Sequence, residues 1–580
     1  IEFSMIEIFP DEILLEICRY LHCSDVLYSF FDLNSRLNRT ITSYCQHVWF
    51  RRASHKQLLH IYEQILPRIG STVVALTIHP LHQSSFPQAI QLQLSKLFSN
   101  LKTLTLTSWT SANLIQTMID HLQEFEYLEK LVIQELTSSD DLSDWTFLKE
   151  IFTLKNRFLT NLTFDYDCDS FDLKKSVTTP CSSYNLQQLT IQLETINDFV
   201  YLTSFIPNIV HLDVSIKNSS LKCNLTFSKL LHLKRFSLWI IYWYSQYEDL
   251  IPLLAFAPLI EQIFVTISTR DLNLILGTRI HSILPTQLKQ FHYTVCYNSY
   301  DDFDSNLIEQ IKQSWSSLMP IRLSSNENDK RIFLHTLPYS NSRLIIRSSL
   351  AKNMPVDNLD EIYSKVDQIQ VYTMTNISDI FPILKQSHRV RELTLLIPTK
   401  PTVPMANSQT IRLSTLNRLD ILTIEGTPSD LIHFKELLHA APNLSVLVID
   451  FDCLLNLLEN EDQPLITYVY LNRHILDLCI RVQQSTFTIE HIRLISRVFS
   501  RTRNLTIDFE TPEDFSDTNL IPTVLDRFEQ LVIFHIYGKI PQEILNFDIK
   551  QWILQQTTKR IQPNHIFRVE CTATYFKIWL

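Results

Sequence analysis

Glycine is the scarcest feature of this chain, with four residues among 580, at positions 70, 277, 426 and 538. Each of these glycines lies more than a hundred residues from the next. A phosphate-binding P-loop, a dinucleotide-binding fingerprint and the nucleophile elbow of a hydrolase each need at least two glycines within a few residues. The sequence therefore excludes these common sites for nucleotide binding and hydrolysis.

The ten cysteines include no Cys-x-x-Cys pair. We interpret them as small buried hydrophobic side chains in a reducing compartment, either the cytoplasm or the nucleus. The zinc-binding pattern His-Glu-x-x-His is also missing from the sequence. We therefore expect neither a metal site nor a cofactor.

Long apolar runs are scarce as well. The best candidate for a membrane-spanning helix, Leu250–Ile267, contains Pro252, Pro258 and Glu261, which a lipid-facing helix tolerates poorly. The net charge of −10 argues against nucleic acid or an anionic membrane as a general partner. We take Met5 as the native start, and no signal peptide follows it.

A helical pattern stands near the start of the sequence, between Phe9 and Trp49. Pro10 and Asp11 occupy positions where a helix begins. The apolar residues that follow recur at helical spacing, at Ile13, Leu14, Ile17 and Leu21. A segment this short cannot bury enough apolar surface to be stable alone, so it must pack against something else.

This segment resembles the F-box motif. The matching positions are Phe9-Pro10, Glu12-Ile13-Leu14, Ile17, Tyr20-Leu21, Asp25-Val26-Leu27 and Trp49. The chain departs from the motif at Leu37, where the family has an inner tryptophan, and at Asn34, where it has cysteine. The resemblance implies that the segment docks a Skp-type adaptor, and through it a cullin. The implied adaptor-binding residues are Phe9, Pro10, Ile13, Leu14, Ile17, Leu21 and Leu27.

From about Leu101 onward, a short alternating pattern of apolar residues returns every 23 to 31 residues. Each copy predicts a strand with one buried face, and amphipathic helical runs lie between the copies. The middle apolar positions are 104, 131, 162, 189, 212, 236, 263 and 291, then 369, 393, 422 and 447. A last copy lies at Leu531–Ile536, and degenerate copies are fitted into the two gaps at Leu318–Leu323, Leu344–Ile346, Leu476–Ile480 and Asn504–Ile507.

The period and the pattern resemble irregular leucine-rich repeats. The expected fold is α/β: a short all-helical F-box followed by a repeat solenoid with a curved parallel sheet and outer helices. The expected boundaries are 5–55 for the F-box-like domain, 56–95 for linking helices and a cap, and 96–580 for the solenoid.

In such a solenoid, residues beside the buried strand positions face the concave surface. They are polar here, with many threonines and few charges, which suits a surface that binds protein and lacks a cluster of acid, base and nucleophile. The candidate substrate-binding residues are Thr105, Thr190, Asp213, Arg235, Trp239, His292, Gln370 and Thr423.

Together the two resemblances imply the substrate-recognition subunit of a cullin-RING ubiquitin ligase of the SCF type. Such a subunit holds an as yet unidentified protein substrate and is not itself an enzyme. Two alternatives remain open: a repeat scaffold whose N-terminal helices only cap the solenoid, and an enzyme with an unfamiliar site. Adaptor docking requires exposed apolar side chains on the first helix, whereas a cap turns them inward.

Overall fold

The computed structural model forms two compact units. The first comprises Ile1–Ala53, Gln57–Ile321 and Phe333–Thr336, and the second comprises Ser54–Lys56, Arg322–Ile332 and Leu337–Leu580. Within the described residues no helix is long and apolar enough to cross a membrane. The structure describes residues 9–19, 21–50, 53–78, 94–107, 122–136, 148, 151–152, 158–165, 168–173, 183, 185–218, 227–240, 247–299, 305–326, 330–352, 354, 362–374, 376–398, 413–428, 431–459, 471–483, 487–510, 517–557, 561 and 567–580.

The first unit opens with three helices and a short strand: α1 (Asp11–Arg19), α2 (Cys23–Phe30), α3 (Ser35–Tyr44) and β1 (His47–Trp49). Asn34 caps α3, because its side chain accepts a hydrogen bond from the Leu37 backbone N–H at 2.8 Å. The expectation of an all-helical segment is wrong at β1. This strand pairs in parallel with β2 and begins the first sheet, with Val48 buried.

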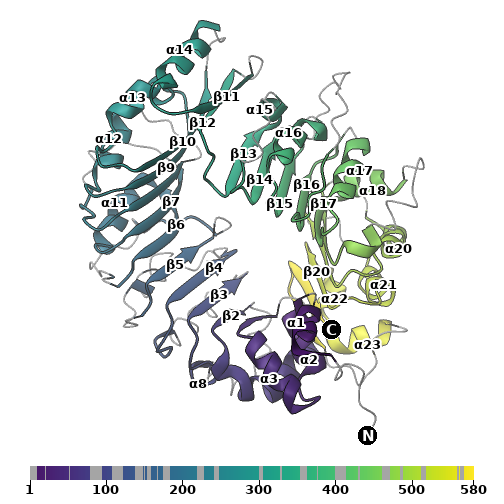
Figure 1. Cartoon of the computed structure of the whole chain (residues 1–580). Coiled ribbons are helices and arrows are strands. Elements are labelled where there is room, and N and C mark those ends of the chain that lie inside the picture. The colour runs from purple at the N-terminus through teal and green to yellow at the C-terminus, as the bar shows by residue number, and fades with distance from the viewer. Residues whose placement is uncertain are drawn as a thin grey trace. The chain divides into compact units, whose positions relative to one another are not determined.

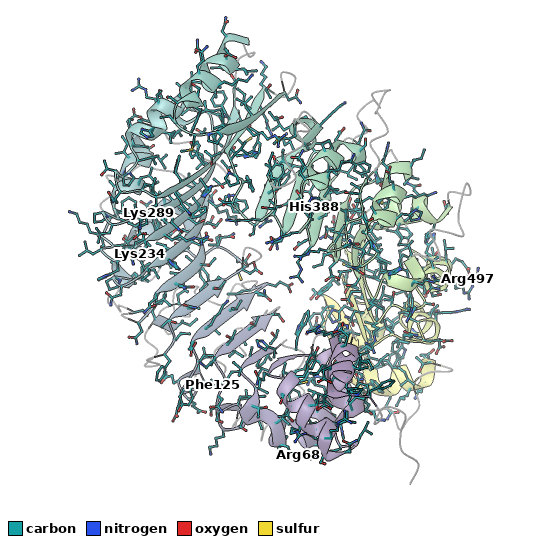
Figure 2. All side chains as sticks on the ribbon, in the orientation of Figure 1. Arg68, Phe125, Lys234, Lys289, His388 and Arg497 are labelled. Atoms are coloured by element: carbon teal, nitrogen blue, oxygen red, sulfur yellow. The ribbon has the colours of Figure 1, made fainter. Side chains whose placement is uncertain are left out.

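The next helices lie where linking helices were expected. The elements are α4 (His55–His60), the π-helix η2 (Ile61–Ile65), α5 (Leu66–Ile69), the 3₁₀-helix η3 (Gly70–Thr72), β2 (Ala75–Ile78) and α8 (Leu94–Leu97). Arg68 of α5 lies beside the N-terminal helices, with Nη1 2.5 Å from Asp32 Oδ1 and its guanidinium 4.8 Å from the centre of the Phe31 ring (Figure 2). Strand β2 was not predicted, and residues 79–93 lie outside the described ones.

The described strands of the first sheet number twelve, in the order β1-β2-β3-β4-β5-β6-β7-β8-β9-β10-β12-β11. The strands after β2 are β3 (Thr103–Thr107), β4 (Lys130–Gln134), β5 (Asn161–Phe164), β6 (Gln188–Thr195), β7 (His211–Asn218), β8 (Arg235–Ile240), β9 (Gln262–Thr269), β10 (Gln290–Asn298), β11 (Ile321–Asn326) and β12 (Arg331–Thr336). From β1 to β10 neighbouring strands are parallel and follow chain order.

The register of these strands confirms the predicted pattern. Each predicted middle position pairs with the next one, so that a single row of apolar side chains crosses the sheet. The row consists of Leu76, Leu104, Leu131, Leu162, Leu189, Leu212, Phe236, Ile263 and Phe291. Because a shift by one residue would turn every apolar side chain to the other face, the alternation itself specifies this register.

The end of the first sheet departs from the predicted succession of repeats. Strand β11 overlaps the copy fitted at Leu318–Leu323, but β12 lies next to β10 and β11 lies beyond it. Strand β12 was not predicted, and the chain order of the strands breaks at this point. The single curved sheet expected for 96–580 is therefore two sheets.

The second sheet has ten described strands in the order β13-β14-β15-β16-β17-β18-β19-β20-β22-β21. Strands β13 to β20 are parallel, and β22 is antiparallel to both β20 and β21. The strands are β13 (Arg343–Arg347), β14 (Gln368–Tyr372), β15 (Glu392–Leu396), β16 (Ile421–Glu425), β17 (Val446–Asp450), β18 (Asp477–Val482), β19 (Asn504–Phe509), β20 (Ile533–Tyr537), β21 (Arg568–Cys571) and β22 (Tyr575–Trp579).

A row of buried apolar residues crosses this sheet as well. It confirms the strands predicted at 369, 393, 422, 447 and Leu531–Ile536, and those fitted near Leu344, Leu476–Ile480 and Asn504–Ile507. Its members are Leu344, Ile369, Leu393, Leu422, Leu447, Leu478, Leu505 and Phe534.

Helices cover one face of each sheet (Figure 1). In the first unit, Phe199 of α11 packs in parallel on Phe236 of β8, and Phe256 meets both rings edge-on. The later helices are α11 (Ile196–Phe205), η5 (Leu272–Leu274), α12 (Tyr247–Ala255), α13 (Gly277–Ser282), α14 (Ser305–Ser316), α15 (Ser348–Lys352), η6 (Ile377–Ile380), α16 (Phe381–Lys385), α17 (Leu431–Ala440), α18 (Phe451–Glu459), α20 (Ile489–Val498), α21 (Leu520–Arg527), α22 (Gln542–Leu545) and α23 (Ile549–Gln556). Since successive side chains of a strand alternate between faces, the residues between the buried ones lie on the opposite face.

Candidate protein-binding surfaces

Four apolar side chains are exposed along α1 and its flanking residues. Phe9, Ile13, Ile17 and Leu21 are 42%, 46%, 38% and 39% exposed. Their four-residue spacing places each about one helical turn after the last, so that they form one stripe, called the α1 stripe below. Pro10, also predicted as a binding residue, is exposed beside Phe9. Exposed apolar groups of this kind mark interaction surfaces in many proteins.

Polar contacts hold the other side of α1 on α3. Arg36 Nε donates to Asp11 Oδ1 at 2.7 Å, and Arg36 Nη2 donates to the Phe9 carbonyl oxygen at 2.5 Å. The hydrogen bond from Arg36 lowers the pKa of the Asp11 carboxyl group. At the far end of α1, the Tyr44 hydroxyl donates to the Cys18 carbonyl oxygen at 3.1 Å. Both ends of α1 are therefore fixed to α3, which leaves the stripe facing outward.

Two of the predicted adaptor-binding residues are not on this surface. Leu14 is 5% exposed and Leu27 is completely buried, so both belong to the core of the helical segment. Leu33 and Trp49 are exposed in the same segment, at 51% and 47%. The resemblance pointed to Trp49, whereas nothing in the periodicity pointed to Leu33, which lies between two helices.

The structure places four of the predicted substrate-binding residues in one row across the first sheet: Thr105, Thr190, Asp213 and His292. The whole row consists of Thr77, Thr105, Val132, Thr163, Thr190, Asp213, Ser237, Phe264 and His292. Arg235 and Trp239 lie two residues before and after Ser237 on β8, and so on the same face. We call this surface the polar face of the first sheet.

A stack of three side chains lies on this polar face. The Arg235 guanidinium lies 4.6 Å from the centre of the Phe264 ring, and the Phe264 and His292 rings stack with centres 4.8 Å apart. Phe264 is only 7% exposed. It was not predicted as a site residue, although it stands between the buried Ile263 and Val265 at a position that the strand alternation assigns to this face.

The other two predicted residues, Gln370 and Thr423, share a row of the second sheet. Gln370 Oε1 accepts a hydrogen bond from Arg343 Nη2 at 2.8 Å. Two sheets, and not one, therefore carry the predicted substrate-binding residues. The row consists of Ile345, Gln370, Thr394, Thr423, Val448, Cys479, Thr506 and His535.

Charged side chains gather two positions further along these strands. Arg481 Nη1 lies 2.5 Å from Glu425 Oε1, and Asp450 Oδ2 accepts a hydrogen bond from the Gly426 backbone N–H. Burial raises the pKa of the carboxyl groups of Asp450 and Asp508. No local sequence pattern indicates this cluster, because its members come from four separate strands whose register only the folded sheet establishes.

The described residues include no group of three or more His, Cys, Asp or Glu side chains that could hold a metal ion. No protein-family model matches the sequence, and no curated protein is found to match it. A function for this chain is therefore argued from its surfaces: one apolar helix face and two polar sheet faces.

Proposed function

We propose that the chain is the substrate-recognition subunit of an SCF-type cullin-RING ubiquitin ligase. The α1 stripe would dock a Skp-type adaptor and, through it, a cullin, in the cytoplasm or the nucleus. The observation that supports this proposal most is the exposure of Phe9, Ile13, Ile17 and Leu21. Helices that only cap a repeat array bury such side chains against it, because the end of the array otherwise exposes its core.

The second part of the proposal concerns the substrate. Parallel strands in chain order, with one apolar residue of each in a single row, resemble leucine-rich repeats, whose open sheet face binds proteins. The polar face of the first sheet offers a rigid surface with an aromatic and cationic centre at Arg235, Phe264 and His292. Such a subunit catalyses nothing. It raises the local concentration of substrate lysines near a ligase-bound conjugating enzyme.

Co-purification of the full chain with a Skp-type adaptor tests the docking step. The test variant is Ile13→Asp/Ile17→Asp, which places two charges in the α1 stripe without touching the buried Leu14. The matched control is Ile432→Asp on α17, since Ile432 is 79% exposed. We expect the wild type and the control to bind, and the double variant to bind at least about tenfold more weakly, because each apolar contact contributes on the order of 1 kcal/mol.

Equal binding by the double variant, or no binding by a well-folded wild-type chain, would contradict the proposal. One observation favours the alternative of a scaffold: β1 joins the N-terminal helices directly to the first sheet, as a cap would be joined. For a cap, the wild type would not bind the adaptor, and adding the charges to α1 would lower the stability of the first unit.

A further inference from the structure

Two cysteines of the N-terminal helical segment lie in contact. The Sγ atoms of Cys23 and Cys45 are 3.7 Å apart, within hydrogen-bonding distance for sulfur, although the residues are 22 positions apart in the sequence. Cys23 is the first residue of α2, and Cys45 directly follows the last residue of α3. The S–S bond of a disulfide is about 2.0 Å long. The two sulfur atoms therefore need to approach each other by less than about 2 Å to become bonded.

The surroundings of the two thiols differ: they favour a reactive thiolate at Cys23 and a protonated thiol at Cys45. Cys23 is partly exposed, whereas Cys45 is only 1% exposed. The partial positive charge at the N-terminus of α2 favours a thiolate at Cys23. Hydrogen bonding from the Cys45 thiol, together with a backbone hydrogen bond at Trp49, lowers the pKa of Cys23. The same interaction and burial raise the pKa of Cys45.

We propose that Cys23 and Cys45 are a site of reversible oxidation, at which a hydroperoxide converts the two thiols into an intramolecular disulfide. The Cys23 thiolate attacks the distal oxygen of the hydroperoxide, which breaks the O–O bond. It forms a sulfenic acid and releases water from hydrogen peroxide, or an alcohol from an organic hydroperoxide, after protonation. The Cys45 sulfur then attacks the Cys23 sulfur, forms the S–S bond and expels the hydroxyl group, which leaves as water with the Cys45 proton. The two sulfur atoms are oxidised by two electrons in total, and the peroxide is reduced.

A third thiol of the same helical segment is less suited. Cys18 of α1 is 6% exposed, and burial raises the pKa of its thiol. Cys168 and Cys453 are buried in other parts of the described chain and serve as internal references. The inference does not depend on the proposed ligase function, because it concerns only the chemistry of the helical segment. The spacing of the cysteines along the sequence gives no sign of this pair.

The test uses the folded full chain and hydrogen peroxide as the probe. After brief exposure, free thiols are blocked with N-ethylmaleimide, and the unreduced chain is digested and analysed by mass spectrometry. We expect a cross-linked peptide pair containing Cys23 and Cys45, and its loss on treatment with dithiothreitol. We also expect Cys23 to lose reactivity towards the maleimide at least about tenfold faster than Cys168. The Cys168→Ser variant should behave like the wild type, and Cys45→Ser should accumulate sulfenic acid at Cys23.

Three results would overturn the proposal. The first is a folded wild-type chain in which Cys23 and Cys45 stay unlinked while other cysteines are oxidised. The second is a cross-link of Cys23 to Cys18 in place of Cys45. The third is a Cys23–Cys45 link that forms no faster in the folded chain than in urea, because folded proximity would then contribute nothing. Since the main measurement is made on the wild type, a variant that folds poorly does not affect it.

Discussion

The Arg36 guanidinium of α3 donates to the Asp11 carboxylate at 2.7 Å and to the Phe9 carbonyl oxygen, and so joins α3 to the first turn of α1. Both charged side chains are about two-fifths exposed, at 40% and 38%. Because solvent screens an ion pair of this kind, it contributes little to the free energy of folding and mainly fixes the position of α1 on α3.

Replacing Arg36 by Met therefore tests how the α1 stripe is held. We expect Arg36→Met to change the urea unfolding midpoint little and to increase amide hydrogen exchange in α1 several-fold, because the first turn loses its anchor. The control is Arg39→Met, an exposed position of the same helix that acts on Asp11 more weakly than Arg36 does. Unchanged exchange in α1 of the Arg36 variant would show that apolar packing alone positions the helix.

The stack on the polar face of the first sheet makes a second prediction. Arg235 over Phe264 is a cation–π pair, which at a partly exposed site contributes about 0.5–1 kcal/mol. A double-mutant cycle with Arg235→Met and Phe264→Leu should give a coupling free energy of that size in urea unfolding. The control cycle combines Arg235→Met with Phe236→Leu. Phe236 lies on the same strand as Arg235, but on the face that the helices cover. Additive effects in the first cycle would rule out the pair as a stabilising contact.

Gly426 makes a third prediction, since it has a φ of +89° and follows β16. A Cβ atom at this position would lie 2.2 Å from the Ile397 carbonyl oxygen, and that oxygen belongs to the backbone and cannot easily move. We expect Gly426→Ala to destabilise the second unit by about 1–3 kcal/mol, measured by urea unfolding. The neighbouring exposed residue provides the control, Thr427→Ala, which should cost less than about 0.5 kcal/mol. A stable Gly426→Ala chain would mean that the turn adopts another conformation.

Lys577 makes a prediction about pH. It lies on β22 between His535 and Glu570, and burial lowers the pKa of its amino group from 10.5 to about 7, although Glu570 opposes the shift. Between these two values the unfolded chain binds the proton and the folded chain does not. The free energy of unfolding of the second unit should therefore increase as the pH rises from about 7 to 10.5. The same stability is lost as the pH falls back through this window to about 7.

The measurement is the urea midpoint between about pH 7 and pH 9 for the wild type and Lys577→Met. We expect the variant to be more stable than the wild type at pH 7 and to show a smaller rise with pH, because it has no proton to lose. Lys539→Met, at an exposed lysine, is the control and should keep the wild-type slope. If the slope of Lys577→Met equals that of the wild type, Lys577 remains charged in the folded chain.

The sequence determined the repeated part of the fold because the residues of each strand by themselves select the face that is buried. Alternation of apolar and polar residues selects one buried face, and parallel strands joined through helices align their buried positions. The predicted middle positions from Leu104 to Phe291 accordingly pair in one row. The same reasoning placed Thr105, Thr190 and Gln370 on the polar faces. Helical spacing predicted α1, but only the structure separated its exposed Ile13 and Ile17 from the buried Leu14.

Only the tertiary structure decided the rest, since it depends on contacts between residues far apart in the sequence. Strand β1 is three residues long, too short for its alternation to be recognised, and it exists because β2 offers a partner. The break into two sheets follows from the position of β12 beside β10, which no local pattern encodes. The contact of Cys23 with Cys45 and the ion pair of Arg481 with Glu425 likewise arise only when folding brings separate helices or strands together. Local periodicity thus determined which face of each element is buried, while packing determined which elements became neighbours.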